Sequence, residues 1–141
     1  MIVERVIDQK AREIRQWPVK SNRASSLGHP CTRYLVLERT HWQEKVLHGP
    51  SLQMVFDIGN DVEDRVLRYL KEAGFTVIEQ QRAFDWPKYN ISGHIDAKIQ
   101  IGSTVYPIEV KSMSPFVFDK TNTVADMLNS KYHYMRSYPA Q

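Results

Sequence analysis

The alternation of apolar and polar residues is most regular over residues 90–101. Apolar or small residues occupy the odd positions and polar residues the even positions, the period of two that a half-buried strand shows. Gly102 and Ser103 follow as a turn, so residues 104–113 are predicted to return as a second strand with Glu109 and Lys111 on one face. An earlier strand is predicted to begin at Phe75. The pattern therefore predicts three sequential, antiparallel strands.

Helical spacing dominates the first half of the chain. Apolar residues recur at helical spacing over 51–73, and Gly74 follows where such a helix would end. Shorter helices are predicted over 2–16 and 31–47, because proline-containing segments follow both. The chain is therefore predicted to have an α/β (α+β) fold, with N-terminal helices followed by a small mixed or antiparallel sheet.

The last part of the chain has weaker periodicity. Residues 124–128 are predicted to form a helical turn, and residues 131–138 are rich in aromatic side chains. Tyr132, Tyr134 and Tyr138 could stack on unpaired bases or pack against the end of the sheet. Both interpretations are compatible with the sequence.

Composition adds the class of protein and an uneven distribution of charge. The 141 residues are 42% hydrophobic and include one cysteine, Cys31, which excludes an internal disulfide and favours the reducing cytoplasm. No apolar run reaches the roughly 20 residues of a membrane-spanning helix. Residues 1–50 hold 9 basic and 5 acidic residues, whereas residues 51–141 hold 10 and 11. We therefore expect a basic helical segment over 1–50, which either approaches a polyanion or is a solvated face, and a core over 51–141.

The candidate chemistry lies on the two regular strands. A tight hairpin would place Asp96 beside Glu109 and Lys111, so that two carboxylates and an amine converge. Carboxylate oxygens of this kind suit Mg²⁺ or Mn²⁺, which would lower the pKa of a bound water and stabilise charge on a phosphate. Lys111 could orient or deprotonate that water, or neutralise the charge that develops on the phosphate.

These residues carry a family resemblance. Asp96, followed after 12 residues by Glu109-x-Lys111, resembles the PD-(D/E)XK nuclease superfamily, with the closest likeness to RecB-like and CRISPR-associated exonucleases. Gly93-His94-Ile95-Asp96 resembles the second motif of that superfamily, and Gly59 with Glu63 resembles the first. The RecB-like branch commonly has histidine at the position of Glu63, so this residue is more similar to the λ-type and viral exonucleases. Gln141 is the only residue that could belong to the fourth motif, Gln-x-x-x-Tyr.

The resemblance implies a restriction-endonuclease-like core and a DNA nuclease that uses Mg²⁺ or Mn²⁺. It implies metal ligation by Glu63, Asp96, Glu109 and the backbone carbonyl of Val110, with Lys111 assisting the attacking water. Glu63 could instead be a structural residue on the flank of its helix. The residues expected to contact DNA are Lys20, Arg23, Arg33, His94, Ser112 and Gln141, although His94 could equally be a plain strand histidine. One rival interpretation is a catalytically inactive nucleic-acid-binding or assembly module on the same scaffold. Another is a structural domain on which Glu109 and Lys111 form an incidental surface pair.

Two features depart from the family pattern. The segment 25–33 resembles the Ser-x-Leu…Cys-x-Arg segment of RecB-like enzymes, some of which bind an iron–sulfur cluster through four cysteines. Cys31 alone cannot hold such a cluster, so either further cysteines lie in a longer parent protein or Cys31 is a buried apolar residue. The superfamily core continues with a helix and a strand, whereas 27 residues follow Ser114. We therefore expect a core that is incomplete at its C-terminus, with an exposed sheet edge. That edge is expected to be covered by self-association or by another protein, or else the chain is expected to be partly disordered near its C-terminus.

Overall fold

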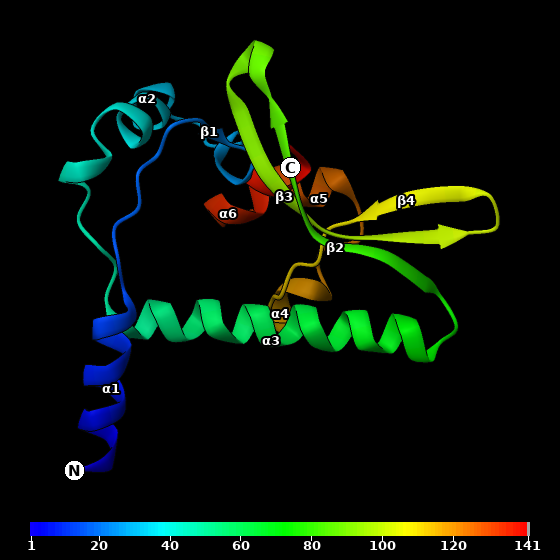
Figure 1. Ribbon diagram of the computed structural model, residues 1–141, viewed down its shortest axis with the longest axis horizontal. Coiled ribbons are helices and arrows are strands. Elements are labelled where there is room, and N and C mark those ends of the chain that lie inside the picture. Colours follow the sequence, from blue (N-terminus) through cyan, green and yellow to red (C-terminus); the bar gives the residue numbers. More distant parts are fainter. Residues whose placement is uncertain (141) are drawn as a thin grey trace.

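The computed structural model describes residues 1–140. This part of the chain contains six α-helices and a four-stranded mixed sheet (Figure 1). The helices are α1 (Ile2–Glu13), α2 (Thr32–Thr40), α3 (Pro50–Glu72), α4 (Pro115–Phe118), α5 (Val124–Leu128) and α6 (His133–Ser137). The strands are β1 (Asn22–Arg23), β2 (Thr76–Trp86), β3 (Ile91–Ile101) and β4 (Thr104–Ile108). The mixed content confirms the α+β class.

Strand β3 is the centre of the sheet. β2 and β4 both pair with it antiparallel, as the sequence pattern predicts. The two-residue strand β1 pairs with it in parallel, with Asn22 opposite Ile91. The long helix α3 runs along the sheet on one side, and the short helices α5 and α6 lie on the other side (Figure 1). Residues of β3 that face α3 can therefore meet the side chains of that helix.

Helix α3 and strand β3 begin and end within one residue of the predicted positions, whereas α2 and β4 are shorter than predicted. α2 ends at Thr40, and the next residue, His41, leaves the helical region with φ of −128°. β4 ends at Ile108 because the backbone N–H of Val110 donates to the side chain of Asp96, 2.8 Å away, instead of to the backbone of β3. Glu109 and Lys111 therefore follow the strand rather than lie on it.

The buried core is small. In the part of the chain that the structure describes, the buried apolar residues are Leu67 of α3, Ala97 and Ile99 of β3, and Met135 of α6. α1 contributes no buried residue, and an ion pair of 2.8 Å between Lys10 and Asp57 ties it to α3. The core thus joins α3, β3 and α6, while α1 projects from it (Figure 1).

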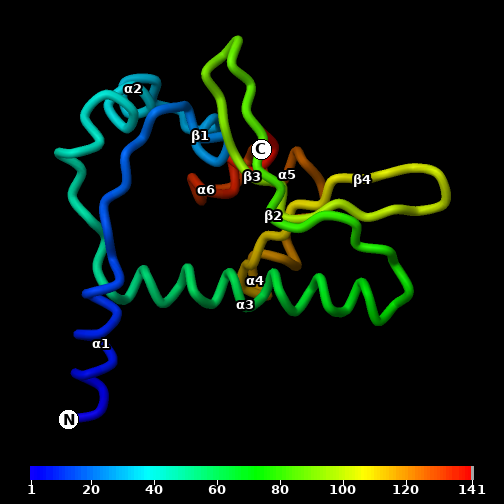
Figure 2. Tube along the Cα trace, in the orientation of Figure 1, coloured from blue at the N-terminus to red at the C-terminus, as the bar shows by residue number. Residues whose placement is uncertain are grey.

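The segments that lead to and from α2 run beside each other between that helix and the junction of α1 with α3 (Figure 2). The side-chain amide of Gln16 in one segment donates a hydrogen bond to the carbonyl of Trp42 in the other. Within residues 1–140 no helix has the length and apolar character needed to cross a lipid bilayer.

Candidate metal centre

Glu63 lies on the side of α3 that faces the sheet, one turn after Gly59. A Cβ at Gly59 would lie 3.8 Å from the hydroxyl oxygen of Ser112. The segment that follows β4 therefore passes close to α3 at this glycine. The fold thus brings the predicted first motif, on α3, next to the predicted third motif, at the end of β4.

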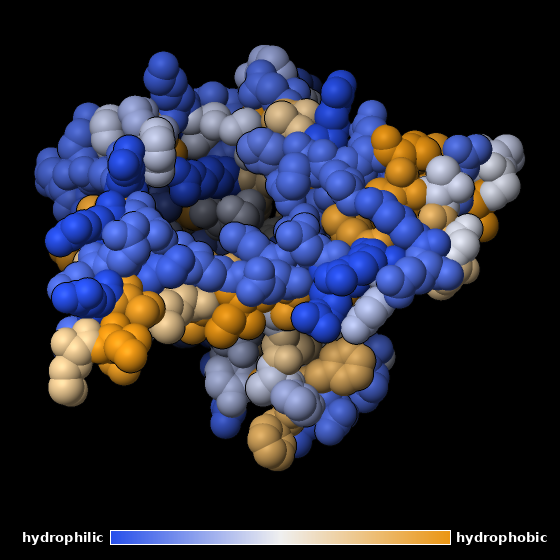
Figure 3. All heavy atoms as spheres, turned by 60° about the horizontal axis from the view of Figure 1, so that its bottom comes forward, coloured by the Kyte–Doolittle hydropathy of each residue, from blue (hydrophilic) through white to orange (hydrophobic). Residues whose placement is uncertain are grey.

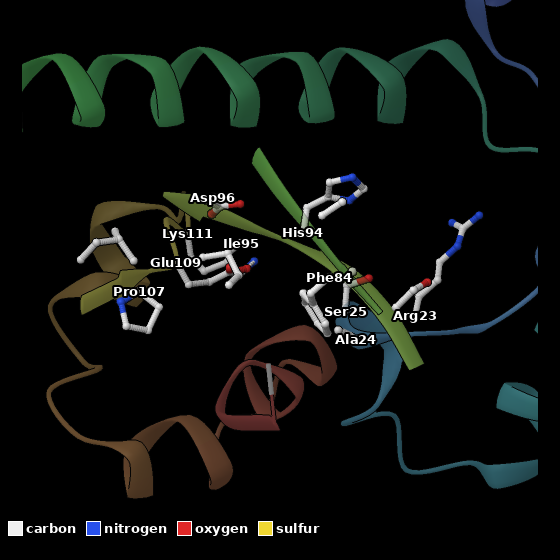
Figure 4. Close-up of a pocket in the computed structure, with 14 residues that line it drawn as sticks. Arg23, Ala24, Ser25, Phe84, His94, Ile95, Asp96, Pro107, Glu109 and Lys111 are labelled. Atoms are coloured by element: carbon white, nitrogen blue, oxygen red, sulfur yellow. Dashed lines mark hydrogen bonds and ion pairs between the residues drawn. The ribbon is translucent and has the colours of Figure 1, made fainter. Parts of the chain in front are cut away.

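Asp96 is half-buried on β3. Its side chain and that of His94 lie on the side of the strand that faces α3 (Figure 4). The Oδ2 atom of Asp96 accepts the hydrogen bond from the N–H of Val110, which fixes the carboxylate against the segment that follows β4. Since Val110 uses its N–H in this way, the same contact ends the β3–β4 pairing and orients Asp96.

Glu109 comes directly after the last pair of the β3–β4 ladder, Ala97 with Ile108, and so lies next to Asp96. Its carboxylate forms an ion pair with Lys111. The amine of Lys111 also lies 5.4 Å from the ring centre of Tyr138. The side chains of Glu109 and Lys111 lie further from α3 than that of Asp96 does (Figure 4). Glu109 and Lys111 thus pair with each other at the edge of the C-terminal helices.

Two of the predicted carboxylate ligands act on the third, Glu63, as like charges. Burial raises the pKa of Glu63 above its usual range, a hydrogen bond from Gln81 lowers it, and the nearby carboxylates of Asp96, Asp64 and Glu109 raise it further. Within residues 1–140, however, no three histidine, cysteine or acidic side chains are close enough together to hold a metal ion. Each predicted ligand instead has a protein partner: the Gln81 amide, the Val110 N–H and the Lys111 amine respectively.

A pocket of about 750 Å³ opens beside these residues. Asp96, Glu109 and Lys111 line one end, and Arg23 lines the other (Figure 4). His94 also lines it, so two of the residues predicted to contact DNA share a cavity with the predicted ligands Asp96 and Glu109. The other two predicted ligands, Glu63 and Val110, are not among the described residues that line it. Lys20, Arg33 and Ser112 are not among the described residues that line this pocket. Gln141 lies outside the described residues.

Cys31 is exposed and free. It comes directly before α2, and its side chain is exposed to solvent rather than packed in the core. The interpretation of Cys31 as a buried apolar residue is therefore wrong.

The three C-terminal tyrosines form a cluster. The rings of Tyr132 and Tyr134 stack at 5.6 Å between centres, and Tyr134 lies 5.8 Å from Tyr138. Burial raises the pKa of Tyr138, and Tyr134 contributes to the same shift. Since Tyr138 also lies under the amine of Lys111, the cluster packs against the candidate site.

Sequence reasoning missed Gln81. Its side-chain Nε2 donates to Oε1 of Glu63 at 2.5 Å, which links β2 to α3. The one visible signal was the pair of adjacent apolar residues Val77 and Ile78, which breaks the alternation of this strand. The register of β2 against β3 shifts at that point, between Val77 and Glu79.

Comparison of the chain with protein-family models, with curated proteins and with solved structures found no match.

Proposed function

We propose that this protein is a divalent-metal-dependent deoxyribonuclease that hydrolyses phosphodiester bonds. The observation that supports this function is that Asp96, Glu109 and Lys111 line one end of a single pocket. Glu63 of α3 lies near enough for the charges of Asp96 and Glu109 to add to the rise of its pKa that burial causes. A neighbourhood of acidic groups without a bound cation is costly, because each carboxylate disfavours ionisation of the others. The resemblance of the motifs to RecB-like enzymes favours an exonuclease.

The donor set fits Mg²⁺ or Mn²⁺ by its chemistry. Glu63, Asp96, Glu109 and the carbonyl of Val110 offer only oxygen atoms, the ligands that these hard cations prefer. A bound ion would supply a water of lowered pKa and positive charge against the phosphate. Glu109 must part from Lys111 to act as a ligand, because the two form an ion pair in the described structure.

Lys111 and Arg23 have separate roles in this proposal. Once released from Glu109, the amine of Lys111 lies at the carboxylate end of the pocket, where it can orient the attacking water or stabilise negative charge on the phosphate. Arg23 lies at the opposite end, where its guanidinium can bind a second phosphate of the chain. The pocket volume falls within the range of about 300–1,000 Å³ that is typical of ligand sites.

Cleavage of end-labelled DNA in Mg²⁺ or Mn²⁺ tests the proposal. We expect cleavage that chelation abolishes and that Lys111→Ala slows by about 100-fold or more, the usual contribution of a positioned acid–base group. Lys88→Ala is the matched control, because Lys88 contacts the ring of Tyr89 beyond the end of β2. Equal rates for the two variants, or cleavage that persists in chelator, would contradict a metal-dependent role of Lys111. Cleavage of linear DNA without cleavage of closed circular DNA would support an exonuclease.

The alternative is a catalytically inactive module that binds nucleic acid or assembles with other proteins. The ion pair between Lys111 and Glu109 favours it, as does the lack of a ready-made group of three metal-binding side chains within residues 1–140. Such a module would bind DNA with an affinity that falls as salt rises. It would not cleave DNA at any Mg²⁺ or Mn²⁺ concentration.

A further inference from the structure

Gln81 has a backbone conformation that residues other than glycine rarely adopt. It lies in the middle of β2 with φ of 48°, in the left-handed region where Cβ crowds the backbone carbonyl. Within residues 1–140, Asn90 is the only other non-glycine residue with positive φ, and it closes the turn Pro87–Tyr89. No turn accounts for the conformation of Gln81. A strained residue in the middle of a strand suggests that its side chain has a functional position.

The register of the sheet places Gln81 opposite Asp96. A β-bulge near the start of β2 adds one residue to that strand, and the pairing then continues without a further shift. The pairs on either side are Gln80 with Ala97 and Arg82 with Ile95. These flanking pairs place Gln81 level with Asp96. The hydrogen bond from its side chain to Glu63 shows that Gln81 points toward α3, the helix that covers the face on which Asp96 lies.

The amide of Gln81 reaches from this position to α3. Its Nε2 donates to Oε1 of Glu63 at 2.5 Å, and a carboxylate that accepts one such bond keeps its second oxygen for another ligand. The negative charges of Asp96 and Glu109 act on Glu63 at the same time. The neutral amide of Gln81 therefore holds the carboxylate of Glu63 near those of Asp96 and Glu109.

We propose that Gln81 is a positioning residue that orients Glu63 for a divalent cation. The inference rests on the proposed function. It adds a residue, Gln81, that contacts the predicted metal ligand Glu63 and not the metal itself. Residues that hydrogen-bond to metal ligands typically change metal affinity by about 10- to 100-fold when they are replaced.

Calorimetric titration of Mn²⁺ into the DNA-free protein tests this inference, together with thermal unfolding of the same samples. Gln81→Met keeps the size of the side chain and removes the donor, whereas Gln81→Gly removes the donor and suits positive φ. Both variants should bind Mn²⁺ about 10- to 100-fold more weakly than the wild type. Gln81→Gly should unfold at or above the wild-type temperature. Gln80→Met, on the neighbouring residue, is the control and should change the dissociation constant by less than about twofold.

The outcomes separate this inference from the proposed function. If the wild type binds Mn²⁺ and both Gln81 variants bind it equally well, Gln81 has no positioning role, while the metal site stands. If affinity falls only in step with the unfolding temperature in both variants, or falls as much in Gln80→Met, the role of Gln81 is structural and the inference is overturned. If the wild type binds no Mn²⁺, the proposed function fails, and this inference fails with it.

Discussion

The closest backbone approach at a glycine lies between Gly28 and Ser137, and replacing Gly28 by alanine should weaken the fold. A Cβ at Gly28 would lie 2.6 Å from the Cα of Ser137 and 2.7 Å from its carbonyl oxygen. Ordinary van der Waals contact begins at 3.4 Å, so the two segments must separate by roughly 0.8 Å or more. Both obstructing atoms belong to the backbone, and no side-chain rotation can relieve the clash.

Overpacking of this kind costs about 1–3 kcal/mol. For a chain of this length that corresponds to a fall of roughly 3–12 °C in the unfolding midpoint. The effect should also reach the candidate site, because Ser137 precedes Tyr138, whose ring lies under the amine of Lys111.

Gly59→Ala is the matched control. A Cβ there would meet only the Ser112 hydroxyl, at 3.8 Å, an ordinary contact. Alanine also favours the interior of a helix by about 0.5–1 kcal/mol over glycine. Gly59→Ala should therefore stabilise the protein, and Gly28→Ala should destabilise it, in unfolding followed by circular dichroism. Gly28→Ala with the wild-type midpoint would refute the close approach of these segments.

Three further predictions concern the site, the core and the surface. The raised pKa of Glu63 means that its contribution to stability is fully present below about pH 4.5 and is lost as the pH rises through the raised value. In denaturant titrations at several pH values, Glu63→Gln should lack this loss of stability with rising pH. If the unfolding free energies of the wild type and the variant fell in parallel as the pH rose, the prediction would be contradicted. Met135 is fully buried, so Met135→Ala should cost about 2–5 kcal/mol of unfolding free energy, and a change below about 1 kcal/mol would contradict its place in the core. The accessible surface of 10798 Å² exceeds the roughly 7,500 Å² of a compact monomer of this mass, so sedimentation should detect self-association, and a monomer at all concentrations would contradict it.

That surface includes apolar side chains that a larger core would bury. Val55 and Ile58 of α3 are 58% and 59% exposed, and Val6 and Ile7 of α1 are 46% and 43% exposed. Apolar side chains are visible on the surface of α1 and along one edge of α3 (Figure 3). Exposed apolar surface of this kind commonly marks a contact with another protein, whereas the sequence predicted a partner at the edge of the sheet.

The regular elements could be predicted because each follows a single local period. The period of two over 90–101 gave β3 to within a residue, and helical spacing did the same for α3. The two-residue strand β1 was not predicted, because Asn22 and Arg23 are too few to show a period. β4 was predicted too long because a pattern does not reveal that Asp96 captures the N–H of Val110.

The proximity of the residues on the hairpin could be predicted, whereas the partner of each carboxylate could not. The strand pattern and the spacing pointed to Asp96, Glu109 and Lys111, and the hairpin brings these residues together. The choice of partner for each carboxylate depends on three-dimensional contacts, and Glu109 pairs with Lys111 two residues along the chain. The left-handed backbone of Gln81 likewise leaves no mark in the sequence, because glutamine is not a residue that favours positive φ.

We propose that Glu63, Asp96 and Glu109 together hold a divalent cation. The most direct measurement is the anomalous scattering of manganese in crystals of the wild-type protein grown with Mn²⁺, with crystals of Asp96→Asn as the control. We expect one strong peak bounded by these three carboxylates and the carbonyl of Val110, absent from the variant. Ordered carboxylates with no manganese between them, or a peak that persists in Asp96→Asn, would contradict it.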